Sequence, residues 1–282
     1  LRKGLHVMTT NVNETSAVDL AEQMIGRPVP PVHQRLEVES DRPVLEIERI
    51  TVLNDSSNLA LNDCTMTVRR GEIVGIAGID GNGQIELAQT IMGLQKVELG
   101  HVRFYPSNEP QSDISSELVT NIPTHHLRQK SYGYIPSDRH TDGLVLPFSL
   151  SENLLLNPHQ LKKHLNTKSW FSFLGVVLDR DSLRSSMADL VQKFDIRTPS
   201  TEISADALSG GNQQKVIIAR ELSTNPDFLL AVNPTRGLDI GAIDYVHQQL
   251  LDQRHKQRGV LLISSELDEV LALSDRIFVI FD

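Results

Sequence analysis

The chain contains 282 residues, with 27 lysines and arginines against 36 aspartates and glutamates, so its formal net charge is −9. This acidic balance argues against extensive nucleic-acid binding, which requires a basic face. Cys64 is the only cysteine, which excludes an intramolecular disulfide and a cysteine-based zinc site. Hydrophobic residues make up 39 %, enough for a chain of this size to bury a substantial core.

The first 43 residues predict a segment separate from the main domain. Residues 1–27 are expected to form a strand and then a helix, because Ala17, Leu20 and Met24 recur at helical spacing. Residues 28–43 contain four prolines and mixed charges, a composition typical of an extended linker. Since one strand and one helix cannot bury each other, we expect them to pack on a domain outside this sequence, and the chain to be a fragment of a longer protein.

The main domain is expected to begin near Val44. Strands are predicted over residues 44–52, 60–68 and 72–77, followed by a glycine-rich loop and a helix over residues 84–92. Residues 147–207 are expected to be mostly helical. The last third predicts a helix ending at Leu222, and then strand 228–232, helix 242–254, strand 260–264, helix 266–273 and strand 276–281. Strands that alternate with helices indicate a parallel sheet with crossover connections.

The glycine-rich loop has the spacing of a phosphate-binding loop, G-x-x-x-x-G-K-[ST], between a strand and a helix. Its residues are Gly78, Gly81, Asn82, Gly83, Gln84 and Ile85, together with Ile79 and Asp80. Such a loop directs main-chain N–H groups and a helix N-terminus at an anion. However, Gln84 at the lysine position has no charge, and Ile85 at the Ser/Thr position has no hydroxyl for Mg²⁺. Taken alone, the pattern is also that of an ordinary turn.

Four further segments occur in a characteristic order. The sequence LSGGNQQK, Leu208–Lys215, resembles the signature of ATP-binding-cassette (ABC) proteins in the form found in their sugar-importer branch. Asn225–Ala242 resembles the Walker B and D-loop stretch, Ser131–Leu156 the Q-loop stretch, and Leu261–Ile280 the H-loop and its following helix. The chain is therefore similar to the second, C-terminal cassette of a tandem ATP-binding protein that imports simple sugars or nucleosides.

This resemblance implies a fold and a domain organisation. The expected fold is α/β, with a phosphate-binding-loop NTPase (RecA-like) core, an antiparallel β subdomain and an α-helical signature subdomain. The cassette would cover residues 44–282 and be truncated at its C-terminus, with the helical subdomain at about residues 147–212. Residues 1–27 would be the end of a preceding cassette.

Departures from the family pattern indicate that the cassette's own ATP site is degenerate. The Walker B aspartate, which helps to hold Mg²⁺, falls on Val232, and the catalytic glutamate falls on Asn233, which cannot act as a general base. The H-loop histidine falls on Ser265, and the Q-loop glutamine falls near Ser137. We therefore expect no catalytic residues or metal site of this half's own, and whether the isolated domain has enzymatic activity stays open.

The signature and the D-loop are intact. Cassettes of this family dimerise head to tail, so the resemblance implies that this half supplies Leu208, Ser209, Gly210, Gly211, Asn212 and Gln213 to ATP and Mg²⁺ held mainly by the first cassette. Asp239 of the D-loop would lie across the dimer from that site, and Ser137, Asp138 and Arg139 would belong to the coupling surface. The implied partners are the first cassette, transmembrane permease subunits and, indirectly, an extracellular or periplasmic substrate-binding protein, at the cytoplasmic face of the cell membrane.

Two alternative functions stay open at this point. One is a non-transport ABC protein associated with ribosomes or DNA repair, which would be expected to keep two competent ATP sites. The other is a regulatory nucleotide-binding or dimerisation module without hydrolysis. The acidic charge and the Q-loop stretch favour the importer over the first, and the intact signature disfavours a module that has lost nucleotides altogether.

Overall fold

A computed structural model describes residues 9, 11, 15, 40–79, 81–107, 116–166 and 177–281 of the chain. The strand and helix predicted over residues 1–27, and most of the linker predicted over residues 28–43, lie outside the described residues. In the part that is described, no helix is both long and apolar enough to cross a lipid bilayer.

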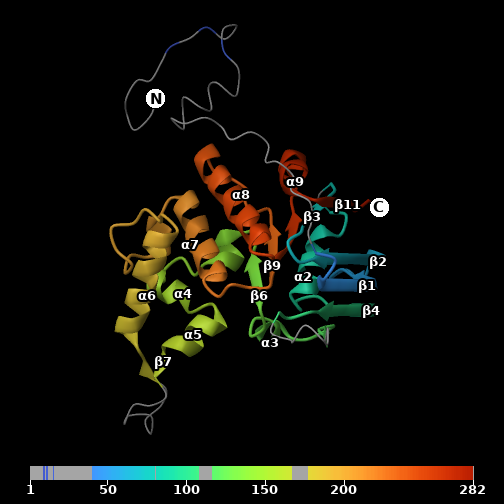
Figure 1. Ribbon diagram of the computed structural model, residues 1–282, viewed down its shortest axis with the longest axis horizontal. Helices are drawn as coiled ribbons and strands as arrows, with labels where there is room; N and C mark the ends of the chain where they lie inside the picture. Colours follow the sequence, from blue (N-terminus) through green and yellow to red (C-terminus); the bar gives the residue numbers. More distant parts are fainter. Residues whose placement is uncertain are drawn as a thin grey trace.

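A five-stranded parallel sheet forms the centre of the molecule (Figure 1). Its strands, in spatial order, are β11 (Arg276–Val279), β3 (Ile73–Ala77), β10 (Gly259–Ile263), β9 (Phe228–Val232) and β6 (Tyr132–Ile135). Every residue of β3, β9 and β10 is buried. Their nearly continuous apolar sequences are those of strands that are covered on both faces.

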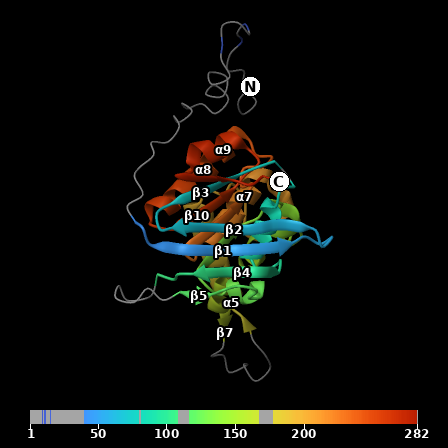
Figure 2. The same cartoon turned by 90° about the vertical axis from the view of Figure 1, so that its right-hand side faces the viewer.

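An antiparallel sheet covers one side of the central sheet (Figure 2). Its strands, in spatial order, are β2 (Leu59–Arg69), β1 (Pro43–Leu53), β4 (Val97–Phe104) and β5 (Glu117–Leu118). Helix α2 (Gln84–Ile91) begins at the glycine-rich loop and buries Leu87, Ala88 and Ile91 in the core that both sheets share. The loop is thereby fixed at the carboxyl end of β3.

Helices cover the other face of the central sheet and extend away from it (Figure 1). They are α4 (Leu150–Leu154), α5 (Pro158–His164), α6 (Arg180–Lys193), α7 (Gly210–Leu222) and α8 (Ile240–His255). The remaining elements are α3 (Thr124–Leu127), the π-helical turn η2 (Arg139–Gly143), the strand pair β7 (Leu165–Asn166) and β8 (Val177–Leu178), the 3₁₀ turn η4 (Ala205–Ala207) and α9 (Leu267–Leu273). Leu183 and Met187 of α6 pack in the same core as Ile217 of α7.

The expected fold is confirmed: a parallel core carries an antiparallel β subdomain and a helical region. Strand β9 has the predicted bounds, α2, α8 and α9 begin and end within two residues of the predictions, and α7 ends at Leu222 as predicted. Strands β4 and β6, which belong to the antiparallel and the parallel sheet respectively, are not among the predicted elements.

Candidate functional site

The three motifs predicted to form the cassette's own ATP site follow the carboxyl ends of neighbouring parallel strands. The glycine-rich loop follows β3, Asn233 follows β9, and Ser265 follows β10. In open α/β sheets, ligands bind at this edge. The structure therefore brings the predicted residues together, and their side chains decide what the edge can bind.

Gln84 folds back into the glycine-rich loop that precedes it. Its Nε2 donates to the carbonyl oxygen of Ile79 at 2.9 Å, and its Oε1 accepts from the main-chain N–H of Asn82 at 3.1 Å. The side chain also fills the space above Gly78, where an added Cβ would lie 2.4 Å from Nε2. A neutral carboxamide therefore occupies the interior of the loop and takes up one of its N–H donors, where a phosphate would need both space and positive charge.

The positions expected to hold Mg²⁺ are apolar. Val232 is buried, and Ile85 exposes 57 % of its surface at the start of α2. Neither offers the carboxylate or hydroxyl oxygen that Mg²⁺ requires. In the described part of the chain, no group of three or more His, Cys, Asp and Glu side chains is placed to hold a metal ion. These residues do not fit a magnesium site.

Asn233 and Ser265 bind each other. Asn233 Oδ1 accepts from the main-chain N–H of Ser265 at 2.8 Å and from its hydroxyl at 3.3 Å. Asn233 has a positive φ of 43°, a conformation that asparagine tolerates better than most residues. The two positions expected to carry a base and a histidine instead form a structural link between the ends of β9 and β10.

The N-terminus of α7 is open, in contrast to the glycine-rich loop. Ser209 is its N-cap residue, but its hydroxyl makes no capping hydrogen bond. The main-chain N–H groups of Gly210, Gly211 and Asn212 have no acceptor in the part of the chain that the structure describes. Three N–H donors and the exposed Ser209 therefore face outward at the positive end of a 13-residue helix. Such an arrangement favours an anion.

Buried glutamines anchor this terminus in the fold. Gln213 Nε2 donates to the carbonyl oxygen of Ala205 at 3.0 Å, and Gln214 Nε2 donates to that of Pro234 at 2.7 Å. The second bond ties α7 to the turn that leads from β9 to Asp239. The Asp239 carboxylate caps α8 by accepting from the N–H of Ala242 at 2.9 Å. The start of α7 is thus hydrogen-bonded to the segment that leads to Asp239.

The predicted coupling residues point in different directions. Asp138 caps η2, and the main-chain N–H groups of His140 and Thr141 hold the pKa of its carboxyl below the ordinary value. Arg139 reaches the signature: its Nη1 donates to the carbonyl oxygen of Arg236 at 3.0 Å, and its Nη2 lies 3.0 Å from where a Cβ of Gly210 would be. Only Ser137 faces the groove described next.

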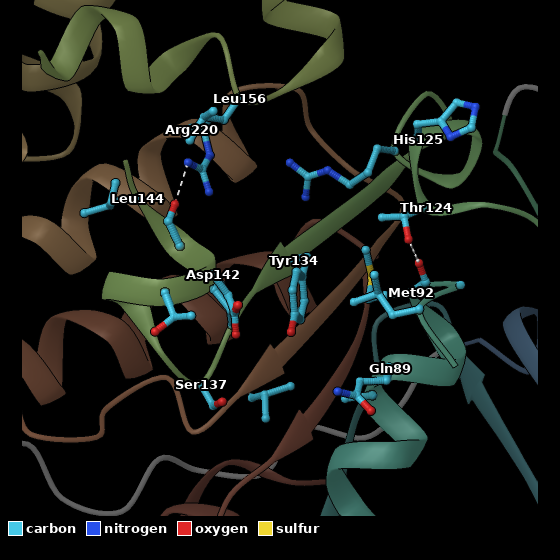
Figure 3. A pocket seen from close by; sticks show the side chains of 18 of the residues that line it. Gln89, Met92, Thr124, His125, Tyr134, Ser137, Asp142, Leu144, Leu156 and Arg220 are labelled. Atoms are coloured by element: carbon cyan, nitrogen blue, oxygen red, sulfur yellow. Dashed lines mark hydrogen bonds between the residues drawn. The ribbon is translucent and has the colours of Figure 1, made fainter. Parts of the chain in front are cut away.

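A groove of about 900 Å³ runs between α2 and the helical region (Figure 3). Gln89 and Met92 lie on its α2 side, Leu144, Leu156 and Arg220 lie on its helical side, and Tyr134 lies between them. Ile85 and Val232 also line it. The groove therefore extends from Ile85 and Val232, the positions that the family pattern assigns to Mg²⁺ binding, to Ser137.

Two residues that line the groove, Arg128 and Arg220, belong to a buried ionic network. Glu221 is fully buried and accepts from Arg128 through two bonds, of 2.8 and 3.0 Å, and from Arg220 Nε at 2.7 Å. Burial opposes ionisation of Glu221, but the two guanidinium groups outweigh it and lower its pKa. Arg220 also donates to the carbonyl oxygen of Gly143 at 2.8 Å. The network ties α7 to α3 and η2.

Three features could not be found from the sequence: this network, the Arg139–Gly210 contact and the Gln84 side chain that folds back into its own loop. The first two join residues far apart in the chain, for which the sequence carries no local signal. The sequence shows that the lysine position carries an uncharged glutamine, but it does not show that the Gln84 side chain lies inside the loop.

The chain matches one family model and several curated relatives. The sequence model of the family "ABC transporter" matches residues 61–236. The chain is 40 % identical over its whole length to the guanosine import ATP-binding protein NupO of Bacillus subtilis (strain 168), 39 % to the nucleoside import ATP-binding protein NupA of Lactococcus lactis, and 38 % to the glucose import ATP-binding protein TsgD13 of Haloferax volcanii. It spans about half the length of these relatives, 52, 52 and 48 % respectively.

Solved structures support the fold. A nucleotide-free ATP-binding cassette from an ABC transporter superposes with a TM-score of 0.64 at 23 % identity, over 85 % of this chain and 88 % of that one. A dimeric cassette bound to ADP and Pi gives the same TM-score at 20 % identity, over 84 % of this chain and 94 % of that one.

Proposed function

The chain belongs to the ABC transporter family, and on that premise we propose that it is the second cassette of an ATP-binding subunit that energises import of nucleosides or simple sugars. The names of relatives at 38 to 40 % identity support this substrate class. Those relatives are about twice as long as the chain, which supports a first cassette in the same protein.

The two cassettes would divide the labour of ATP hydrolysis. The contrast between the two anion-binding features carries this proposal: Gln84 fills the glycine-rich loop, whereas the N-terminus of α7 presents free donors. This half would therefore hydrolyse no ATP in its own loop. It would complete the site of the first cassette, whose phosphate-binding loop would hold ATP and Mg²⁺.

In that composite site, each residue of this chain has a defined role. The Ser209 hydroxyl and the N–H groups of Gly210 and Gly211 would donate to the γ-phosphate and stabilise the charge that develops on it during transfer. Mg²⁺ would neutralise phosphate charge from the partner's side. Arg139 and Gln214 hold the signature and the D-loop in register, so Asp239 would reach the dimer interface in a fixed position.

The groove beside Ser137 is the proposed contact with the membrane permease subunits. It is open and partly apolar, and it lies on elements that are tied to α7 through Glu221. A permease segment seated there would be mechanically connected to the signature. The subunit would then lie peripherally at the cytoplasmic face of the membrane, and its link to a substrate-binding protein would be indirect.

Substitutions at the signature test the proposal in the two-cassette protein. Ser209→Ala is expected to lower ATPase kcat about 10- to 100-fold, the range for a lost hydrogen bond to a charged group. Gly210→Asp should abolish activity, because it brings negative charge to the phosphate position and displaces Arg139. Ser56→Ala, in the exposed β1–β2 turn, is the matched control and should leave ATPase unchanged.

Unchanged ATPase in both signature variants would contradict the composite site. Pull-down from membranes tests the importer separately. Recovery of ribosomes instead of permease subunits would favour the non-transport alternative.

A further inference from the structure

Ser209 is an N-cap residue that does not cap its own helix. A serine at this position ordinarily accepts from a main-chain N–H in the first turn. Here the Ser209 hydroxyl oxygen instead accepts from the side chain of Asn212, whose Nδ2 lies 3.0 Å from it.

A main-chain hydrogen bond fixes the orientation of the Asn212 amide. Its Oδ1 accepts from the N–H of Arg197 at 2.8 Å. Because a main-chain N–H can only donate, Oδ1 must face Arg197, and Nδ2 must therefore face Ser209. The Ser209 oxygen thus acts as an acceptor toward Asn212, and its single proton is left for another partner. That proton has no acceptor within the described residues, and Ser209 is exposed.

We propose that Asn212 is a positioning residue that keeps the Ser209 hydroxyl proton directed away from α7, toward the γ-phosphate of the composite site. This inference rests on the proposed function and adds to it a residue that orients the Ser209 hydroxyl. Without the amide, the hydroxyl is free to rotate and to cap its own helix, and it no longer presents its proton to the phosphate.

A double-mutant cycle in the two-cassette protein tests whether Asn212, held by the Arg197 N–H, orients the Ser209 hydroxyl. We expect Asn212→Ala to lower ATPase kcat/KM about 3- to 10-fold, the range for a neutral hydrogen bond. In the Ser209→Ala background the same change should have an effect of less than about 2-fold, because no hydroxyl remains to be oriented.

Nucleotide affinity provides a second readout that a purely structural role would not move. Asn212→Ala should weaken binding of a non-hydrolysable ATP analogue and leave binding of ADP, which lacks the γ-phosphate, unchanged. The urea midpoint of unfolding should stay that of the parent protein. If the alanine variant does not fold, Asn212→Asp keeps the acceptor for the Arg197 N–H, reverses the bond to Ser209 and adds a negative charge, so it is compared with Asn212→Asp in the Ser209→Ala background, where only the charge acts and the loss of ATP affinity should be smaller. Its ATP affinity should then fall while its ADP affinity stays.

The possible failures are distinguishable. If Ser209→Ala lowers ATPase but Asn212→Ala has the same effect in both backgrounds, or weakens ADP and ATP analogue equally, the positioning role is overturned and the composite site stands. If Ser209→Ala itself has no effect, the composite site is overturned, and the role of Asn212 with it.

Discussion

Removing the buried carboxylate of Glu221 is expected to destabilise the fold strongly. Among the described residues, Glu221→Ala leaves buried Arg220 with the carbonyl oxygen of Gly143 as its one remaining partner, and leaves Arg128 without its two bonds to a carboxylate. Breaking a buried ionic network by deleting one partner costs about 3–5 kcal/mol. At roughly 2–4 °C per kcal/mol for a chain of this size, the melting temperature should fall by about 6–20 °C.

Urea titration of the parent protein, Glu221→Ala, Glu221→Gln and Glu98→Gln measures the corresponding loss in the free energy of unfolding. Glu221→Gln keeps the shape and one acceptor oxygen but loses the charge, so its free energy of unfolding should lie between those of the parent and Glu221→Ala. Glu98→Gln is the matched control, because the Lys96–Glu98 pair is solvent-exposed and such pairs contribute little. A loss below about 1 kcal/mol for Glu221→Ala would refute the reasoning, since the network would then not hold α7 to α3 and η2.

Three further outcomes follow from single features of the structure. Gly83→Ala should lower the urea midpoint, because Gly83 has a φ of 98° and an added Cβ would lie 2.5 Å from the carbonyl oxygen of Ala60; an unchanged midpoint would contradict that geometry. Stability should be full above about pH 5, where both carboxyls are ionised even in the unfolded chain, and fall as the pH drops further, because the folded state lowers the pKa of the Glu221 and Asp227 carboxyls despite their burial. Urea titrations between pH 7 and 3 measure this loss, and a midpoint that rises on acidification would reverse the sign. Gln84→Lys should not create a second active site, because no metal-ligating carboxylate follows β9; trapping of a second nucleotide by the variant would show otherwise.

The sequence predicted those parts of the fold whose patterns are local. Strand β9 is a run of five buried apolar residues and has the predicted bounds, and α8 begins and ends within two residues of its predicted range. Strand β4 was missed because its sequence is mixed, and because Gly100, at a φ of 89°, interrupts it where it pairs irregularly with β1. Strand β6 has only four residues, and its place is set by packing against β9.

For the candidate site, too, the sequence predicts some features and not others. Motif spacing predicts which residues stand at the positions of the lysine, the carboxylates and the histidine, and the structure brings these positions to one edge of the sheet. What the replacements do could not be predicted, because Gln84 inside the loop and Asn233 on Ser265 are outcomes of three-dimensional packing. Likewise, the contact of Arg139 with the signature joins distant parts of the chain.

The most direct test of the division of labour is a count of trapped nucleotides. The purified two-cassette protein is incubated with MgATP and vanadate, and the bound nucleotide is quantified per molecule after gel filtration. One trapped nucleotide per protein is the predicted result, with trapping lost in Ser209→Ala and retained in Gln84→Ala. Two trapped nucleotides per protein would contradict the proposal that this half donates its signature and does not use its own phosphate loop. The same proposal would be contradicted by one nucleotide that stays trapped in Ser209→Ala but not in Gln84→Ala.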